Sequence, residues 1–257
     1  MNILALRNVT MRFGGLVAND DISFDVAAGA LHAVIGPNGA GKTTLFNIIS
    51  GFVAPTSGTV EFDEAAVTGM PQHEIASRGL VRTYQLVQLF KDLTVAENVR
   101  VGFHRVSKGG IASALFRPKW ACEQELDLTR RTAEILEFVG LARQADALAD
   151  KLPYGQQRLL EVARALAAEP KLLLLDEPAA GLNVQETDQL ADVIERVNGR
   201  GISVLLVEHD MSLVMRVAQR ITVLDFGRKI AEGAPAEIKA HPDVLAAYLG
   251  GVETAND

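Results

Sequence analysis

The sequence has one cysteine, few aromatic residues and no long apolar run, and each shortage excludes a class of protein. A single cysteine, Cys122, in 257 residues excludes a disulfide scaffold and a cysteine-rich zinc site, and it fits a reducing compartment. The most apolar neighbourhood, residues 159–175, is interrupted by charged side chains, so it falls short of the ~20 apolar residues that a membrane-spanning helix requires. The first residues lack the pattern of a signal peptide. The chain is therefore expected to be cytosolic in character.

Positive charge is also scarce. The formal net charge is −7 and the pI is near 5.3, which argues against a protein whose main task is to grip the phosphates of nucleic acid. Hydrophobic residues make up 48% of the chain and charged residues 22%, which excludes disorder. A chain of this length and composition can bury a sizeable core, in one large domain or two small ones.

Three short apolar runs predict the strands of a buried sheet. Residues 31–35 are almost continuously apolar, which is typical of a strand covered on both faces. Residues 171–175 and 202–207 are similar runs separated by a charged helical stretch, the pattern of a βαβ unit in a parallel sheet. The fold class is therefore expected to be α/β.

The middle of the chain, residues 94–168, is expected to be mostly helical. Thr94 to Glu97 reads as a capping box, and the apolar periodicity of residues 126–139 continues to Gly140. Glycine and proline between 107 and 120 predict a surface insertion.

Residues 36–43 match the phosphate-binding pattern G-x-x-x-x-G-K-[ST] at every fixed position. A strand is expected before the loop and a helix after it, so that backbone N–H groups and the helix N-terminus converge on phosphate oxygens. Lys42 would then reach the β and γ phosphates, and Thr43 would hold magnesium. The residues expected to bind the nucleotide here are Gly36, Pro37, Asn38, Gly39, Ala40, Gly41, Lys42, Thr43 and Thr44.

Two carboxylates, Asp176 and Glu177, follow the apolar run that ends at residue 175. Ligands of open α/β sheets bind at the carboxyl ends of the strands. Asp176 is expected to coordinate magnesium, directly or through water, and Glu177 to orient and deprotonate an attacking water.

With four further motifs in the same order, the chain resembles a nucleotide-binding subunit of the ATP-binding cassette (ABC) transporters over essentially its full length. Residues 82–85, Arg-Thr-Tyr-Gln, resemble the Q-loop, residues 152–158 occupy the place of the signature motif, and residues 180–183 that of the D-loop. His209 stands where the family has its switch histidine, and Phe13 where it has an aromatic residue that stacks on adenine.

The resemblance implies ATP as the ligand, Mg²⁺ as the cofactor, and a role for each motif. Gln85 would sense the γ phosphate and link it to the membrane interface. A helix starting near Gly155 would offer N–H groups and its positive dipole end to ATP bound by the partner subunit. The implied catalytic residues are Lys42, Gln85, Glu177 and His209; the metal ligands are Thr43, Gln85 and Asp176; the residues that bind ATP in trans are Tyr154, Gly155 and Gln156.

Two motifs depart from the common family pattern. Pro153 and Tyr154 replace the serine and first glycine of the usual Leu-Ser-Gly-Gly-Gln signature, and Asn183 replaces a frequent aspartate. These departures, together with residues 82–85, resemble the ATP-binding subunits of branched-chain amino acid importers. Leu86 differs, because asparagine is expected there, and it lies in the region expected to meet the membrane subunits.

The resemblance implies a P-loop ATPase core with a mostly parallel sheet, an antiparallel N-terminal β part and an inserted helical subdomain. All of this would form one nucleotide-binding domain over residues 1–251. We expect the core at about 1–90 and 165–235, the helical subdomain with the signature at about 91–164, a C-terminal helical tail at 235–251, and a polar tail at 252–257.

The resemblance also implies partners. We expect a dimer with a second ABC ATPase, identical or related, at the cytoplasmic face of the membrane. The dimer would dock on two transmembrane permease subunits, serve a solute-binding protein indirectly and bind no nucleic acid. The solute would be an apolar amino acid or a chemical relative such as urea, an amide or an aromatic acid.

Two alternatives stay open at this point. The ATPase of a lipopolysaccharide exporter is similar in length and organisation, but its signature is expected to carry the serine that is missing here. A soluble ABC ATPase of translation or DNA repair would fuse two cassettes or insert a long coiled coil, and 257 residues leave room for neither.

Overall fold

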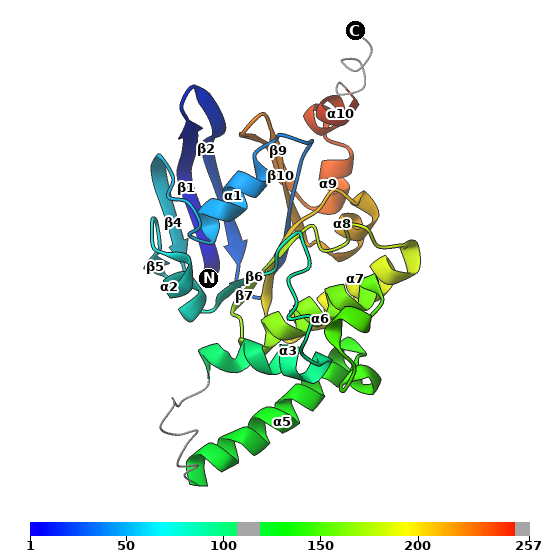
Figure 1. Cartoon of the computed structure of the whole chain (residues 1–257). Coiled ribbons are helices and arrows are strands. Elements are labelled where there is room, and N and C mark those ends of the chain that lie inside the picture. Colours follow the sequence, from blue (N-terminus) through cyan, green and yellow to red (C-terminus); the bar gives the residue numbers. More distant parts are fainter. Residues whose placement is uncertain (107–118, 250–257) are drawn as a thin grey trace.

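The computed structural model describes residues 1–106 and 119–249, so most of the insertion expected between 107 and 120, and the polar tail, lie outside the described residues. Lys119 and Trp120, the end of that expected insertion, are instead the first residues of helix α5 (Lys119–Val139). Two sheets lie beside each other with helices around them (Figure 1). The first sheet is antiparallel, in the order β2-β1-β4-β5, and its strands are β1 (Asn2–Phe13), β2 (Leu16–Ala27), β4 (Ser57–Phe62) and β5 (Ala65–Ala66). This sheet is the antiparallel N-terminal part that the sequence predicts.

The second sheet has the order β10-β9-β3-β8-β7-β6 and is parallel except at its β10 edge, which pairs antiparallel with β9. Its strands are β3 (Leu31–Ile35), β6 (Leu80–Arg82), β7 (Leu172–Asp176), β8 (Ser203–Val207), β9 (Arg220–Asp225) and β10 (Arg228–Gly233). The predicted βαβ unit is confirmed, because β7 and β8 are parallel neighbours joined through α7 (Val184–Gly199).

The central strands β3, β7 and β8 are buried at every residue because the sheet is covered on both faces. Leu173 and Leu175 point into a core shared with the large helices, whereas Leu172 and Leu174 point into a core shared with α1 and the antiparallel sheet. The continuous apolar runs of the sequence thus reflect two cores, one on each side of a single sheet.

Helices α3, α5 and α6 gather below the sheets in Figure 1, and α7 and α8 lie beside them. The predicted capping box is present, since the Thr94 hydroxyl accepts from the Glu97 amide at the start of α3. The α-helices are α1 (Lys42–Ile49), α2 (Gln72–Ser77), α3 (Val95–Gly102), α5 (Lys119–Val139), α6 (Tyr154–Ala167), α7, α8 (Met211–Val217), α9 (Pro235–Lys239) and α10 (Pro242–Leu249). Because α6 continues to Ala167, a domain division at residue 164 would fall inside this helix.

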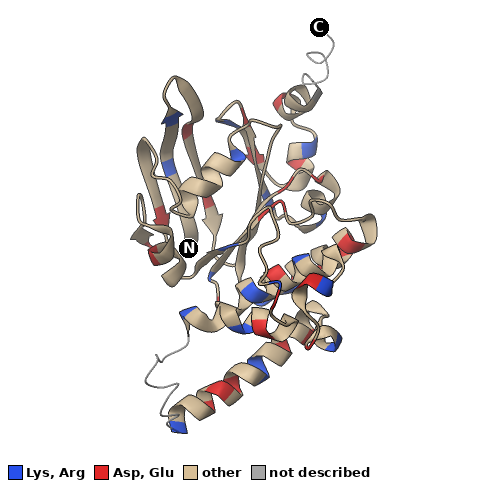
Figure 2. Cartoon of the chain, in the orientation of Figure 1, with Lys and Arg blue, Asp and Glu red and all other residues tan. Residues whose placement is uncertain are grey.

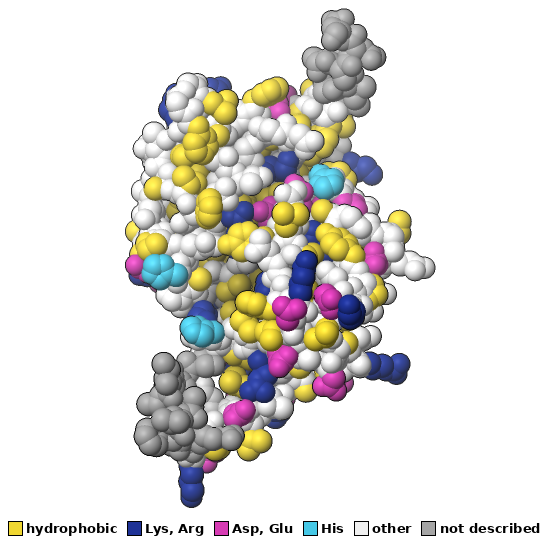
Figure 3. All heavy atoms as spheres, in the orientation of Figure 1, with side chains coloured by type: hydrophobic (Ala, Val, Ile, Leu, Met, Phe, Trp, Pro, Cys, Tyr) yellow, Lys and Arg dark blue, Asp and Glu magenta, His cyan; other side chains and the backbone are white. Residues whose placement is uncertain are grey.

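None of the helices in the described ranges combines the length and the apolar character needed to cross a membrane. Lys and Arg alternate with Asp and Glu along the helices in Figure 2, most clearly on α5. In Figure 3, exposed hydrophobic side chains are interspersed with charged ones on the same face.

Candidate functional site

The loop between β3 and α1 curls tightly enough to require glycine. Gly36, Gly39 and Gly41 all have positive φ angles, of 153°, 81° and 94°. A Cβ on Gly41 would lie 2.4 Å from the backbone oxygen of Ala18, so no other residue fits there. The loop ends at the N-terminus of α1, where helix N–H groups and the positive end of the dipole are free for an anion.

The side chain of Lys42 folds back against the phosphate loop. Its ammonium donates to the carbonyl oxygens of Gly36 (2.6 Å) and Pro37 (2.9 Å). Burial lowers the pKa of Lys42, and the nearby carboxylates of Glu177 and Asp176 oppose that change. The cation is thus held beneath the loop, while Thr43 in the next position is exposed.

The carboxyl end of β7 carries the two predicted acids in different environments. Asp176 is buried, and its Oδ2 accepts from Arg82 Nη2 at 2.7 Å. Glu177 has a φ of 46°, which is unusual for a residue with a side chain, and its amide donates to the Val207 carbonyl at 2.9 Å. This backbone turn takes Glu177 off the strand direction at the edge where the loops meet.

Two of the predicted catalytic residues, Gln85 and His209, lie near a third, Glu177. Gln85 Nε2 donates to Glu177 Oε2 at 2.6 Å, and His209 Nδ1 lies 3.9 Å from the same oxygen. Gln85 follows β6 and His209 follows β8, the strands on either side of β7. The sheet order therefore brings together side chains that are far apart in the sequence.

Glu208 holds the loop of His209 in place, and the sequence analysis did not predict it. Its buried carboxylate accepts from the amides of Ala179 (2.7 Å), His209 (3.0 Å) and Asp210 (3.3 Å). Burial raises the pKa of Glu208, and the three amide hydrogen bonds oppose the rise. An acid directly after the apolar run 202–207 is the signal that would have found it. The carboxylate fixes the loop of His209 against the segment that follows Glu177.

The predicted signature residues begin α6, as expected. The first amide bonded within the helix is that of Gln157, which donates to Pro153, so the amides of Tyr154, Gly155 and Gln156 lack helical partners. In the described parts of the chain, no hydrogen bond or ion pair joins these three residues to the phosphate loop. Their predicted role, the binding of ATP in trans, stays a prediction.

The signature also touches the D-loop of the same chain. A Cβ on Gly181 of the D-loop would lie 3.1 Å from the Tyr154 ring, and one on Gly155 would lie 2.6 Å from the carboxylate of Glu186 on α7, the helix that follows the D-loop. Arg158 follows on α6 and donates to the backbone oxygens of Tyr84 (3.2 Å) and Gln85 (2.5 Å). One helix therefore contacts both the D-loop and the segment that carries Gln85.

Phe13 ends β1 and is 50% exposed. The neighbouring strand β2 reaches the phosphate loop, since Asn19 Nδ2 donates to the Gly41 carbonyl at 3.2 Å. The hairpin that carries Phe13 is thus connected to the loop of Lys42.

The C-terminal helix α10 returns to the phosphate loop, a contact that sequence reasoning missed. Pro37 to Ala40, the β9–β10 turn and α10 line a hollow of about 540 Å³. Burial raises the pKa of Tyr248, and a hydrogen bond with the Gly36 backbone opposes that rise. Tyr248, an aromatic residue in an otherwise aliphatic stretch near the C-terminus, was the signal that could have predicted this contact.

The side chains proposed for magnesium fit that ion. Thr43 supplies a hydroxyl, Gln85 an amide oxygen, and Asp176 the carboxylate oxygen that Arg82 does not occupy. Oxygen ligands of this kind, with few charges, are those that Mg²⁺ prefers when a nucleotide supplies the rest.

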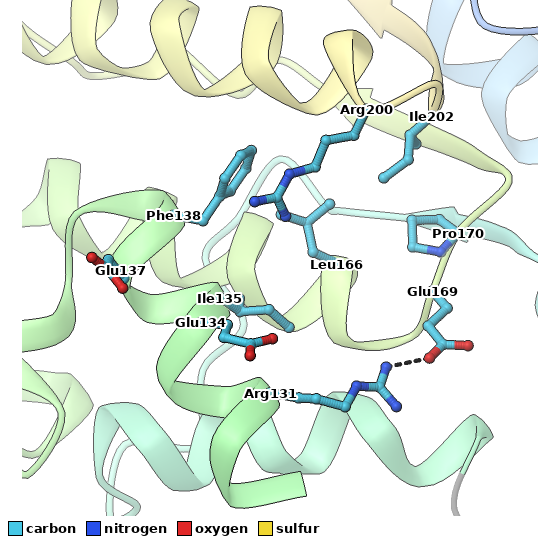
Figure 4. Close-up of a pocket in the computed structure, with 10 residues that line it drawn as sticks. All are labelled: Arg131, Glu134, Ile135, Glu137, Phe138, Leu166, Glu169, Pro170, Arg200 and Ile202. Carbon is cyan, nitrogen blue, oxygen red and sulfur yellow. Dashed lines mark hydrogen bonds and ion pairs between the residues drawn. The ribbon is translucent and has the colours of Figure 1, made fainter. Parts of the chain in front are cut away.

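A groove of about 630 Å³ lies elsewhere, among α5, α6 and the end of α7 (Figure 4). In the close-up the Arg200 guanidinium lies over the Phe138 ring, 3.7 Å from its centre, and Arg131 pairs with Glu169. Pro170 lies two residues before β7 and Ile202 one residue before β8, so the groove lies at the amino ends of these strands. It contains none of the predicted site residues; Gln85, Glu177 and His209 follow the opposite, carboxyl ends of β6, β7 and β8.

Two family profiles match the chain. The ABC transporter profile matches residues 19–180, and the profile of the branched-chain amino acid ATP-binding cassette transporter matches residues 228–254. Both regions contain parts of the site, the first the phosphate loop and Asp176, the second α10.

Curated relatives match nearly the whole chain. This chain is 44% identical over 249 residues to "High-affinity branched-chain amino acid transport ATP-binding protein LivG" of Salmonella typhimurium. The match covers 96% of this chain and 98% of that one. The identity and coverage are the same for the branched-chain amino acid transport ATP-binding protein BraF of Pseudomonas aeruginosa.

Solved ABC cassettes share the fold. The ADP conformation of an ATP-binding cassette of an ABC transporter is 33% identical, with a TM-score of 0.85, covering 97% of this chain and 99% of that one. A dimeric cassette bound to ADP and Pi is 25% identical, with a TM-score of 0.75, covering 90% of this chain and 98% of that one.

Proposed function

The chain belongs to the ABC transporter family, and from this premise we propose that it is the ATP-hydrolysing subunit of an importer for branched-chain amino acids or related apolar solutes. The observation that carries the chemistry is the meeting of Gln85 and His209 at Glu177, one residue after Asp176. The relatives that match over nearly the full length carry the importer assignment.

ATP binding rests on the phosphate loop and Lys42. The amides of residues 36–43 and the N-terminus of α1 receive the phosphates, and Lys42 exchanges its bonds to Gly36 and Pro37 for the β and γ phosphates. Phe13 stacks on adenine. Magnesium, when bound, neutralises phosphate charge, and Thr43, Gln85 and Asp176 would hold it.

Hydrolysis is assigned to the group around Glu177. Its carboxylate takes a proton from the attacking water, and the Gln85 hydrogen bond fixes the carboxylate in place. His209 contacts the γ phosphate from the loop that Glu208 anchors. Because β6, β7 and β8 are adjacent, these residues act on the same phosphate.

The site is completed by a second ATPase subunit, identical or related. The free amides of Tyr154, Gly155 and Gln156 would bind the γ phosphate of ATP held by the partner, so ATP joins the two subunits. These amides take over the role of the absent signature serine. Closure on ATP and reopening after hydrolysis would be transmitted to the permeases.

Two membrane permeases and a solute-binding protein would complete the importer at the cytoplasmic face of the membrane. Leu86 directly follows Gln85 and is 75% exposed, which supports this segment as the contact with a permease. The solute class is taken from the relatives, because a motor subunit does not touch the solute.

The test is uptake by the reconstituted assembly. The tagged chain is extracted gently from its native membranes, its co-purifying proteins are identified by mass spectrometry, and the complex is placed in vesicles with its binding protein. We expect ATP-driven accumulation of labelled leucine or valine, and none with Lys42→Ala. Uptake of urea or an aromatic acid instead would correct the solute; ribosomal partners without any permease would contradict the transport role.

A further inference from the structure

The guanidinium of Arg82 joins Asp176 to the helix that follows the phosphate loop. Nη2 donates to Asp176 Oδ2 at 2.7 Å, and Nη1 donates to Asn47 Oδ1 on α1 (2.9 Å) and to Ser50 Oγ at the C-cap of that helix (2.8 Å). The side chains of Arg82 and Asp176 are only 5% and 7% exposed. One cation at the end of β6 thus connects β7 and α1.

Aromatic rings hold the guanidinium in this orientation. Its central carbon lies 5.8 Å from the centre of the Phe46 ring and 5.3 Å from that of Tyr84. Phe46 belongs to α1, whereas Tyr84 belongs to the segment that leads to Gln85. A flat guanidinium can stack and donate in several directions at once, which the ammonium of lysine cannot do.

The arrangement leaves the two oxygens of Asp176 unequal. Oδ2 is bonded to Arg82, so Oδ1 is the oxygen left for a metal ion. A positive charge this close, in a buried setting, also weakens the attraction of the carboxylate for a second cation. Arg82 therefore affects both the direction and the strength of any metal contact made by Asp176.

We propose that Arg82 is a positioning residue for Asp176: it orients the carboxylate toward magnesium and limits the affinity of that carboxylate for the ion. This inference rests on the proposed role of Asp176 as a magnesium ligand. Because Arg82 lies three residues before Gln85, movement of the segment that carries Gln85 is passed to Asp176 through the same guanidinium.

The test compares Arg82→Ala, Arg82→Lys and Asp176→Asn with a matched control, Arg105→Ala. Arg105 also joins separate segments, donating to the backbone oxygens of Ser77, Ala168 and Glu169, but none of these is a site residue. The binding of a fluorescent ATP analogue to the full chain is titrated against MgCl₂, which needs no partner. ATPase turnover and KM are measured on the complex with its co-purifying permeases.

For Arg82→Ala we expect kcat to fall about 10²-fold with little change in KM, since the carboxylate is misplaced. The half-saturating Mg²⁺ concentration should fall about three- to tenfold, because a repelling charge is gone. Arg82→Lys keeps the charge and should restore the Mg²⁺ dependence, while its kcat stays about five- to tenfold low. Arg105→Ala should leave both quantities within about twofold of the unmodified chain.

A rise in the half-saturating Mg²⁺ concentration with Arg82→Ala would overturn the inference, because a purely structural defect weakens binding. If Arg82→Ala does not fold, Arg82→Lys decides, and an unchanged kcat overturns the proposal. Asp176→Asn distinguishes a failure of the proposed metal role of Asp176 from a failure of the inference about Arg82. If that variant keeps the normal Mg²⁺ dependence, the proposed metal role of Asp176 fails; if it loses it while Arg82→Ala behaves like the control, only the inference about Arg82 fails.

Discussion

Replacing Glu177 with glutamine removes the proposed base while preserving the shape of the site. Glutamine is nearly isosteric with glutamate, and its amide oxygen can still accept the 2.6 Å hydrogen bond that Gln85 Nε2 donates. Asp176, Lys42 and the loop amides are untouched. The change therefore isolates proton abstraction from ATP and magnesium binding.

The expected size of the effect follows from the geometry. Positioned general bases contribute about 10²- to 10⁴-fold, or about 3–5 kcal/mol of activation free energy. The upper part of that range is expected, because the Nδ1 of His209 lies 3.9 Å from this oxygen, beyond hydrogen-bond distance, and is not placed to replace the carboxylate. ATP affinity should stay within about threefold, since the phosphate contacts are kept.

The assay measures turnover on the permease complex and nucleotide binding on the full chain. The matched control is Glu195→Gln, which neutralises an acid on α7 that pairs with Arg216. The control should retain its turnover. Glu177→Gln should also trap an ATP-bound dimer, visible by size-exclusion chromatography, because closure occurs but hydrolysis does not.

Turnover of Glu177→Gln within tenfold of the unmodified chain would refute this reasoning and assign water activation to another group. Loss of ATP binding with the variant would also contradict it, because the variant would then have damaged the phosphate site.

Three further predictions concern other parts of the chain. Lys42→Ala should weaken ATP binding about 10²-fold, because it removes the charged donor beneath the loop; fluorescence titration checks this, and unchanged affinity would contradict it. His32 is 1% exposed with its pKa lowered to about 4, so the folded chain takes up its proton later than the unfolded chain as the pH falls through 6.5. The free energy of unfolding, measured with urea, should then fall by about 2 kcal/mol as the pH is lowered from about 7 to about 4.5. His32→Gln should flatten this dependence. Gly155→Ala should reduce ATP-dependent dimerisation, because its Cβ would lie 2.6 Å from the Glu186 carboxylate; adding Glu186→Ala should restore it in part, and no recovery would contradict this cause.

The sequence predicted most of the elements that frame the site, because their signals are local. Residues 31–35 are the buried strand that was expected, and the helix expected after the phosphate loop begins at Lys42. The signature helix begins at Tyr154, next to Gly155 as predicted. Such features depend on apolar runs, glycine conformations and helix ends, each of which is set by a few consecutive residues.

The roles of the site residues came from motif order, and they stay proposals. The structure places Gln85 in a 2.6 Å hydrogen bond with Glu177 Oε2 and His209 Nδ1 3.9 Å from the same oxygen. It places Tyr154 and Gly155 at the start of α6, and their binding of ATP in trans stays a prediction.

The contacts that sequence reasoning missed all join distant segments. Arg82 and Asp176 are paired across two strands, Glu208 binds the amide of Ala179, and Tyr248 reaches Gly36 from the last helix. No local pattern encodes such a pair, because the distance between its members is set by the order of strands in the sheet and by helix packing.

The sequence by itself determined the glycine loop between a buried strand and a helix, because backbone conformation there follows from the residue types. Only the tertiary structure decided which charged groups share an oxygen or a hydrogen bond at that loop. The parallel order β8-β7-β6 and the two cores that cover it bring His209, Glu177 and Gln85 to one edge. Buried charges such as Asp176 must then find partners nearby, and Arg82 is the partner that this packing supplies.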